Sequence, residues 1–225
     1  MLDIIFISYA EPNADNNWQS LKRRFPFAKR LHGVKGIHNA HINAAKMSFT
    51  SMFWIVDGDS EILDSFNFEL PDGLWEESVY VYRALNPVND LTYGYGGIKL
   101  FPKIHTMNMS KNNIDMTTSI TKNFTAVDVV ASKTNFNTDE FNSWKSAFRE
   151  CVKLSSKSIQ GQVDNETEQR LDDWCSKGAD RLFGEFVIQG AIAGKEYGTK
   201  YKDNLESLKN INDFAWLADY FKQRL

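Results

Sequence analysis

Two carboxylates follow the strongest candidate for a buried strand in the chain. Residues 52–56 (MFWIV) lead directly into Asp57, Gly58 and Asp59. Two aspartates separated by one small residue can face a single hard cation, because magnesium and manganese prefer oxygen ligands and share them with substrate phosphates. Gly58 lets the backbone turn without a clash. The spacing predicts an Mn²⁺ or Mg²⁺ site acting as a Lewis acid on a diphosphate, with a surface turn as the alternative.

The segments around this acidic turn alternate between strand and helix patterns. Short apolar runs predict strands, and helical spacing predicts helices, at residues 3–9, 18–24, 28–31, 37–48, 52–56, 79–84 and 125–131. This alternation is typical of an α/β fold with a mostly parallel sheet flanked by helices. Ligands of such sheets bind beyond the carboxyl ends of the strands, which is the place of the acidic turn.

The second half of the sequence is helical in pattern. Helices are expected at residues 139–154, with Thr138 as the cap, and at 165–177, 182–193 and 213–224. We therefore expect a catalytic core in residues 1–135 and a helical C-terminal part in residues 136–225, packed as one compact unit.

Composition narrows the class of protein. The net charge of -3 argues against a basic nucleic-acid-binding domain. The two cysteines form no CxxC motif, which argues against zinc and redox sites. No apolar run is long enough to span a bilayer, and residues 1–7 have no basic signal region. The sequence predicts a cytoplasmic protein with no membrane partner.

Residues 52–59 (MFWIVDGD) resemble the DxD element of glycosyltransferases with the GT-A (Rossmann-like) fold. The stretch DIIFISYAEP is similar to the first strand and loop of that fold, and HINAAKMS to the helix before its DxD strand. The resemblance implies that Asp57 and Asp59 ligate the metal of a nucleotide-sugar donor, for which we expect a UDP-sugar. It also implies donor-site roles for Tyr9, Glu11, Lys35 and His41.

Within that superfamily the chain is most similar to small glycosyltransferases of tailed bacteriophages. Residues 86–102 (NPVNDLTYGYGGIKLFP) and 144–154 (WKSAFRECVKL) carry the similarity. The resemblance implies work in the host cytoplasm and a hydroxymethylated pyrimidine of phage DNA as the acceptor, which an enzyme would flip out of a duplex. A polysaccharide, lipid or protein hydroxyl is the alternative acceptor.

A glycine-aromatic loop is expected to bind the acceptor. Glycines allow close backbone approach and tyrosine rings stack on sugars, which selects Tyr93, Tyr95, Gly96, Gly97 and Lys99. The loop is similar to one in galactosyltransferase-like GT-A enzymes, where an acidic pair follows the glycines. Here Ile98 and Lys99 follow instead. A tight turn between strands is the alternative interpretation.

An inverting transfer needs a base near the acceptor hydroxyl. Asp128 is the first candidate, because a charge within an apolar strand is costly unless it is used or paired. Asp90 is the second candidate. For both, a structural aspartate bonded to the backbone is the alternative, and a retaining enzyme needs no such base. The resemblance to GT-A enzymes, which often take a third metal ligand from later in the chain, makes His105 a candidate for that ligand, with water or phosphate oxygens as the alternative.

Two other functions remain open at this stage. A nucleotidyltransferase also uses strand-end carboxylates and metal, but it needs a glycine-rich, basic phosphate loop that residues 10–17 (AEPNADNN) lack. A non-catalytic phage protein with a GT-A-like core is the other alternative.

Overall fold

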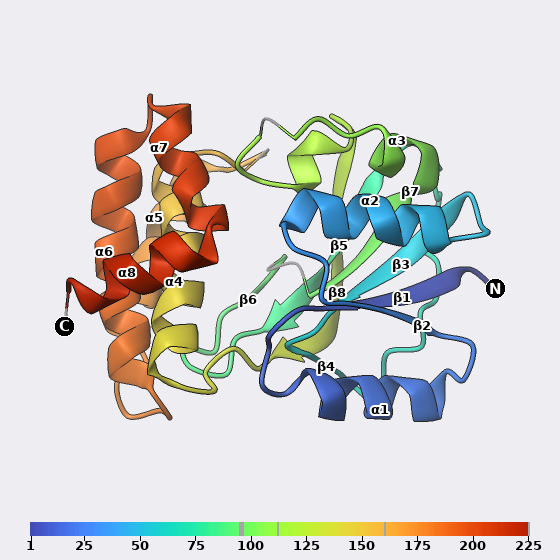
Figure 1. The fold of residues 1–225 in the computed structure, drawn as a ribbon, viewed down its shortest axis with the longest axis horizontal. Coiled ribbons are helices and arrows are strands. Elements are labelled where there is room, and N and C mark those ends of the chain that lie inside the picture. Colours follow the sequence, from blue (N-terminus) through green and yellow to red (C-terminus); the bar gives the residue numbers. More distant parts are fainter. Residues whose placement is uncertain (95–96, 112, 160, 225) are drawn as a thin grey trace. The chain divides into compact units, whose positions relative to one another are not determined.

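The computed structural model describes residues 1–94, 97–111, 113–159 and 161–224, and the chain divides into two compact units. The first, called the α/β unit, comprises Met1–Asn86, Thr92–Lys111 and Met116–Asn135. The second, called the helical unit, comprises Pro87–Leu91, Asn112–Asp115 and Phe136–Leu225. Figure 1 labels their elements. The last segment of the α/β unit ends at Asn135, and the long segment of the helical unit begins at Phe136. The expectation that the two parts pack as one compact unit stays a prediction.

The α/β unit is built on one mixed sheet. Its elements are β1 (Asp3–Ser8), α1 (Ala14–Arg24), β2 (Lys29–His32), α2 (Ile37–Met47), β3 (Met52–Asp57), β4 (Ser60–Ile62), β5 (Val79–Leu85), β6 (Thr92–Tyr93), β7 (Ile98–Pro102), α3 (Lys103–Met107), a 3-10 turn (Thr117–Ser119) and β8 (Phe124–Thr134). The strand order is β2-β1-β3-β7-β5-β8-β4, with β6 paired to β5.

Most strands of this sheet share one direction. β1 is parallel to β2 and β3, β7 is antiparallel to β3 and β5, and β8 is parallel to β5. Hence β1, β2, β3, β5 and β8 point the same way, while β7 and the short β4 and β6 are reversed. The α/β class with a mostly parallel sheet, flanking helices and a helical C-terminal part is confirmed.

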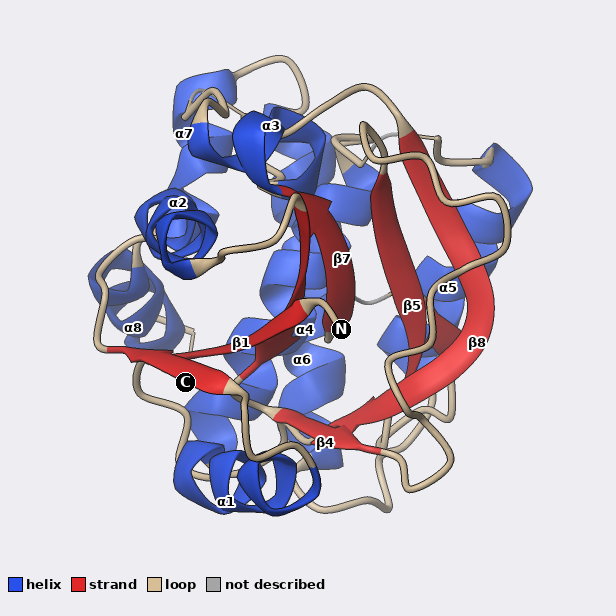
Figure 2. Ribbon diagram, turned by 90° about the vertical axis from the view of Figure 1, so that its right-hand side faces the viewer, coloured by secondary structure: helices blue, strands red, loops and turns tan. Residues whose placement is uncertain are grey.

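Successive side chains of the central strands enter two different cores. Ile4 and Trp54 pack in the cluster that contains Leu21 of α1. Ile5 and Ile55 pack in the cluster that contains Ala44 of α2. Alternation of side chains along a strand produces this division, and α1 and α2 therefore cover opposite faces (Figures 1 and 2).

The first helix is longer than the sequence pattern predicts. It begins at Ala14 instead of residue 18, so the expected loop at residues 10–17 is shorter. The asparagines and aspartates there are typical of a loop, but Ala14 is buried against the sheet at 3% exposure. Burial of this one side chain favours an extra helical turn, and tertiary packing overrides local preference.

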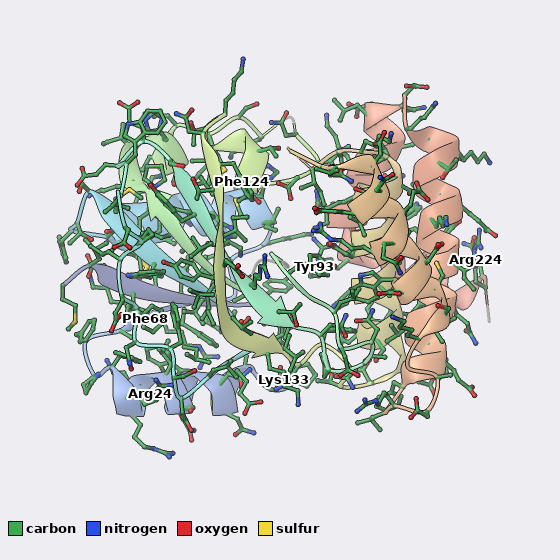
Figure 3. All side chains as sticks on the ribbon, turned by 180° about the vertical axis from the view of Figure 1, so that it is seen from behind. Arg24, Phe68, Tyr93, Phe124, Lys133 and Arg224 are labelled. Carbon is green, nitrogen blue, oxygen red and sulfur yellow. The ribbon has the colours of Figure 1, made fainter. Side chains whose placement is uncertain are left out.

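Strand β4 and the loop after it were not predicted. β4 pairs with the end of β8, and Ser60 lies opposite Thr134. Arg24 of α1 donates to the carbonyl oxygens of Leu63, Asp64 and Phe66, which fixes the start of the loop. β8 is long and bent (Figure 2), and Phe124 and Lys133 mark its two ends (Figure 3). Its bend brings one strand across from β5 to β4.

The helical unit contains five α-helices within its described residues. They are α4 (Glu140–Ser155), α5 (Asp164–Ser176), α6 (Gly184–Tyr201), α7 (Leu205–Lys209) and α8 (Phe214–Lys222), with a 3-10 turn at Asn210–Asn212. The cap of α4 is Asp139, whose Oδ1 accepts from the Asn142 N–H at 2.7 Å, and not Thr138. In the described part of the chain, no helix has the length and hydropathy needed to cross a bilayer.

Helix α6 runs eight residues past its predicted end because its glycines pack against α4. A Cβ on Gly190 would lie 2.3 Å from the Trp144 carbonyl oxygen, and one on Gly194 would lie 2.4 Å from that of Phe148. Gly198 meets Val152 in the same way. The predicted helix ends at residue 193, just before Gly194, because glycine is a common signal for a helix end. In the structure this glycine instead permits close contact between the backbones of α4 and α6.

We expect Gly194→Ala to destabilise the helical unit. Alanine favours the helical state, but its Cβ would force α4 and α6 apart, and such overpacking costs about 1–3 kcal/mol. Urea unfolding followed by circular dichroism measures the change, with Ile192→Ala on the exposed side of α6 as the matched control. Equal or greater stability of Gly194→Ala would contradict the proposed backbone contact.

Candidate functional site

One edge of the α/β unit collects most of the side chains expected to do chemistry. The carboxyl ends of β1, β2 and β3 lie at this edge, together with the start of the reversed strand β7. β1 lies between β2 and β3, and the connections through α1 and α2 pass over opposite faces of the sheet. Ligands of open α/β sheets bind at such a reversal of strand order.

The acidic turn contains a buried ion pair that the sequence analysis did not anticipate. The Lys99 ammonium lies 2.7 Å from the Asp57 Oδ2 atom. The Lys99 side chain is 6% exposed, whereas that of Asp57 is 35% exposed. A buried ammonium is costly unless a carboxylate pairs with it, so Asp57 is the group that makes Lys99 tolerable within β7.

Register and side-chain alternation explain how this pair forms. Lys99 lies opposite Ile55 on β3 and opposite Val81 on β5, so its partner on β3 is two residues before Asp57, the last residue of that strand. Phe101 and Ile55 belong to the core beneath α2. Lys99 is two residues from Phe101 along β7, and Asp57 is two residues from Ile55 along β3, so each points to the same face as its neighbour. Both charged side chains therefore lie on the α2 face of the sheet.

His41 of α2 lies near this ion pair as a neutral ring. It is 3% exposed, and its Nδ1–H donates to the Ile37 carbonyl oxygen at 2.8 Å. Burial, helped by the positive charge of Lys99, lowers the pKa of His41 from 6.5 to about 4, although Asp57 acts in the opposite direction. Its buried Nε2 has no hydrogen-bond partner within the described part of the chain.

Gly58 is required by a close approach between the ends of β1 and β3. A Cβ on Gly58 would lie 2.8 Å from the Glu11 Oε2 atom and 3.0 Å from the Ser8 Cβ. Glu11 in turn accepts from the Tyr9 backbone N–H at 2.7 Å, and the exposed Tyr9 ring begins the loop after β1. Tyr9 and Glu11 thus lie beside the acidic turn, and their donor-site roles stay a prediction.

Hydrogen bonds to three other segments hold the acidic turn. The Asn17 Nδ2 atom donates to the Gly58 carbonyl oxygen at 2.9 Å. The Asn135 N–H donates to the Asp59 carbonyl oxygen at 2.8 Å. The Asp57 N–H donates to the Gly97 carbonyl oxygen at 2.9 Å. The backbone positions of both aspartates are therefore fixed by α1, by the residue after β8 and by the residue before β7.

The polar network that joins Ser8, Arg30 and His32 at the ends of β1 and β2 was not predicted from the sequence. The Arg30 Nε–H donates to the Ser8 hydroxyl, which also lies 2.9 Å from His32 Nδ1. Arg30 pairs with Asp15 at 2.7 Å. In the sequence these basic residues are visible only as the dipeptide Lys29-Arg30. Because successive side chains of a strand point to opposite faces, Lys29 pairs with Asp3 and does not join Arg30 in this network. Lys35 is exposed just before α2.

The acidic turn supplies few metal ligands of its own. Asp57 keeps about a third of its side-chain surface exposed, and Asp59 is half-buried. Across residues 1–94, 97–111, 113–159 and 161–224, no group of three or more His, Cys, Asp or Glu side chains is placed to hold a metal ion. A cation at this turn would therefore need further oxygen ligands from outside the protein, such as those of a phosphate.

His105 lies too far from the acidic pair to complete this shell. Pro102 is paired with Met52, so α3 begins at the amino-terminal end of β3, whereas Asp57 ends that strand. At ~3.3 Å per residue, five steps along β3 separate the two ends by about 17 Å. The suggested third ligand is therefore wrong for geometric reasons.

The glycine-aromatic loop is described only in part. Tyr95 and Gly96 lie outside the described residues. Tyr93 is buried in β6 beside β5, at 6% exposure. Gly97 packs against β4 and β8, since a Cβ there would lie 2.5 Å from the Ser60 Oγ and 2.8 Å from the Ser132 Oγ. Close packing within the sheet explains this glycine without an acceptor.

The two candidate bases are surface residues with ionic partners. Asp128 lies in the exposed stretch of β8, is 83% exposed and pairs with Arg83 at 2.8 Å. The argument from a costly buried charge therefore fails, because that part of the strand is not buried. Asp90 belongs to the helical unit, where it pairs with Arg181 at 3.0 Å. A role as base stays a prediction for both.

No protein-family model matches this chain, and no curated protein matches it. The strand order and directions by themselves are compatible with Rossmann-like α/β folds. Function must therefore be argued from the residues at the edge of the sheet.

The neutral state of His41 leads to a prediction about pH. Between pH 6.5 and about 4 the unfolded chain binds a proton that the folded protein does not, so the free energy of unfolding should fall as pH falls through this window. The loss should approach about 3 kcal/mol relative to His41→Gln. Urea titrations of both proteins at pH 7, 6, 5 and 4.5 measure it, and parallel pH profiles would contradict the burial of a neutral ring.

Proposed function

We propose that the chain is a glycosyltransferase that uses a nucleotide-diphosphate sugar, with a UDP-sugar as the expected donor. The observation that supports this most is the position of Asp57 and Asp59. They follow the central parallel strand β3, next to the end of β1, where open α/β sheets bind ligands. The fit of this pair to a cation that shares phosphate oxygens points to a diphosphate.

In this proposal the donor lies along the ends of β1, β2 and β3. The loop of Tyr9 and Glu11 would contact the nucleoside, and Lys35 would meet the diphosphate from the start of α2. Bound Mn²⁺ or Mg²⁺, held by Asp57 and Asp59, would offset charge on the departing diphosphate. His41 is a positioning residue, because it is buried and acts on the site through Asp57 and Lys99.

The transfer breaks the bond between the anomeric carbon and the diphosphate oxygen and forms one to the acceptor oxygen. The acceptor proton leaves to a base or to the diphosphate. Lys99 is engaged with Asp57, so we assign it to the donor side and not to the acceptor. Tyr93, Tyr95, Gly96 and Gly97 remain the proposed acceptor loop, and Asp128 and Asp90 the proposed bases.

A second candidate function is a non-catalytic binding protein with the same core. The Lys99–Asp57 pair favours it, because a carboxylate that already has an ammonium partner is a weaker metal ligand. Such a protein would bind a nucleotide weakly or not at all.

Thermal shift with nucleotides tests the donor site. UDP with Mn²⁺ should raise the unfolding temperature more than ADP or GDP, and EDTA should reduce the effect, since a ligand at 100 times its Kd adds about 2.7 kcal/mol of apparent stability. Asp59→Asn should lose at least most of this shift. It is preferred over Asp57→Asn, which would leave the buried Lys99 without its partner.

The exposed Asp64→Asn is the matched control, since its carboxylate pairs only at the surface with Arg24. It should behave as the wild type does. No shift with any nucleotide in the presence of Mn²⁺ would count against the enzyme and in favour of the binding protein.

The preferred acceptor is a hydroxymethylated pyrimidine in phage DNA, so the purified protein should transfer labelled sugar to DNA containing hydroxymethylcytosine. Unmodified DNA of the same sequence lacks the nucleophilic hydroxyl and should remain unlabelled. Mass spectrometry of digested nucleosides measures the product. Donor hydrolysis without transfer to the modified DNA would redirect the proposal to a polysaccharide, lipid or protein acceptor.

A further inference from the structure

We propose that Lys99 acts as the resident counter-ion of Asp57 and prevents the acidic turn from binding a divalent cation until a nucleotide diphosphate is bound. The inference rests on the proposed donor site. It concerns the order and coupling of the two ligands, which the spacing of the aspartates does not reveal.

The position of Lys99 is fixed by the sheet. It lies in the middle of β7, which is paired on one side with β3 and on the other with β5. The side chain is almost fully buried, and its ammonium is 2.7 Å from the Asp57 carboxylate. An ammonium in this setting cannot move into solvent without breaking its pair, so it stays beside Asp57 when a cation approaches.

Electrostatics then disfavour a cation in the free protein. A divalent ion bound to Asp57 would lie a few ångströms from the ammonium, and repulsion between like charges is strong where little water screens it. His41 neither adds to this repulsion nor offsets it, because burial keeps the ring neutral. A nucleotide diphosphate brings several negative charges and phosphate oxygens, which can both offset the repulsion and complete the shell.

Titration with Mn²⁺ alone tests the inference directly. Free Mn²⁺ is measured by electron paramagnetic resonance in the wild type, Lys99→Met and Lys99→Arg, without nucleotide. Lys99→Met should bind Mn²⁺ at least about tenfold more tightly than the wild type, since one unit of repelling charge is removed. Lys99→Arg keeps the charge and should remain like the wild type. Circular dichroism and thermal unfolding check that each variant is folded.

A double variant shows whether the new site is the acidic turn. Lys99→Met combined with Asp59→Asn should lose the Mn²⁺ affinity that Lys99→Met gains. Equal Mn²⁺ affinity of the wild type and Lys99→Met would overturn the inference, whether that affinity is high or undetectable. The same titrations repeated with UDP should show UDP strengthening Mn²⁺ binding in the wild type, and less so in Lys99→Met.

The two proposals fail in different ways. Absence of UDP binding to every protein would sink the donor site, while the comparison made with Mn²⁺ alone would still decide the effect of Lys99. Tight Mn²⁺ binding to the wild type without UDP would overturn the role of Lys99 and leave the donor site intact.

Discussion

The ion pair between Lys99 and Asp57 is the constraint on which the edge of the α/β unit depends. The Lys99 side chain is almost fully buried, so its ammonium needs a carboxylate in place of water. Asp57 can supply it because β7 runs antiparallel to β3 and brings the start of one strand beside the end of the other. Removal of one partner from a buried pair typically costs about 3–5 kcal/mol, although the partial exposure of Asp57 reduces that figure here.

The same pair links the chemistry of the edge to the packing of the sheet. Lys99 and Asp57 lie on the α2 face, and their charges act on the buried ring of His41. On the other face, Ser8 and Arg30 form a polar network that reaches Asp15 of α1. The acidic turn therefore lies between two helices that each contribute a polar or charged neighbour. A site of this kind can be tuned by residues that never touch a ligand.

Much of the fold could be read from the sequence because its strands are apolar and short. β1, β3 and β5 were predicted within one or two residues, and so were the starts of α2 and α4. The failures have specific causes. Ala14 became helical through burial, Gly194 stayed helical through contact with a neighbouring backbone, and β4 formed only because β8 bends to meet it.

The sequence alone determined the α/β class, the apolar strand before Asp57 and the nearness of Asp57, Gly58 and Asp59, since all three depend on neighbours along the chain. Only the tertiary structure decided that Lys99 pairs with Asp57, that Glu11 touches Gly58 and that His105 lies at the far end of β3. Strand order and direction set these distances, and they arise from pairing between segments far apart in sequence. The sequence thus predicted which types of side chain lie at the carboxyl ends of β1, β2 and β3. Their charge states and partners followed only from the tertiary structure.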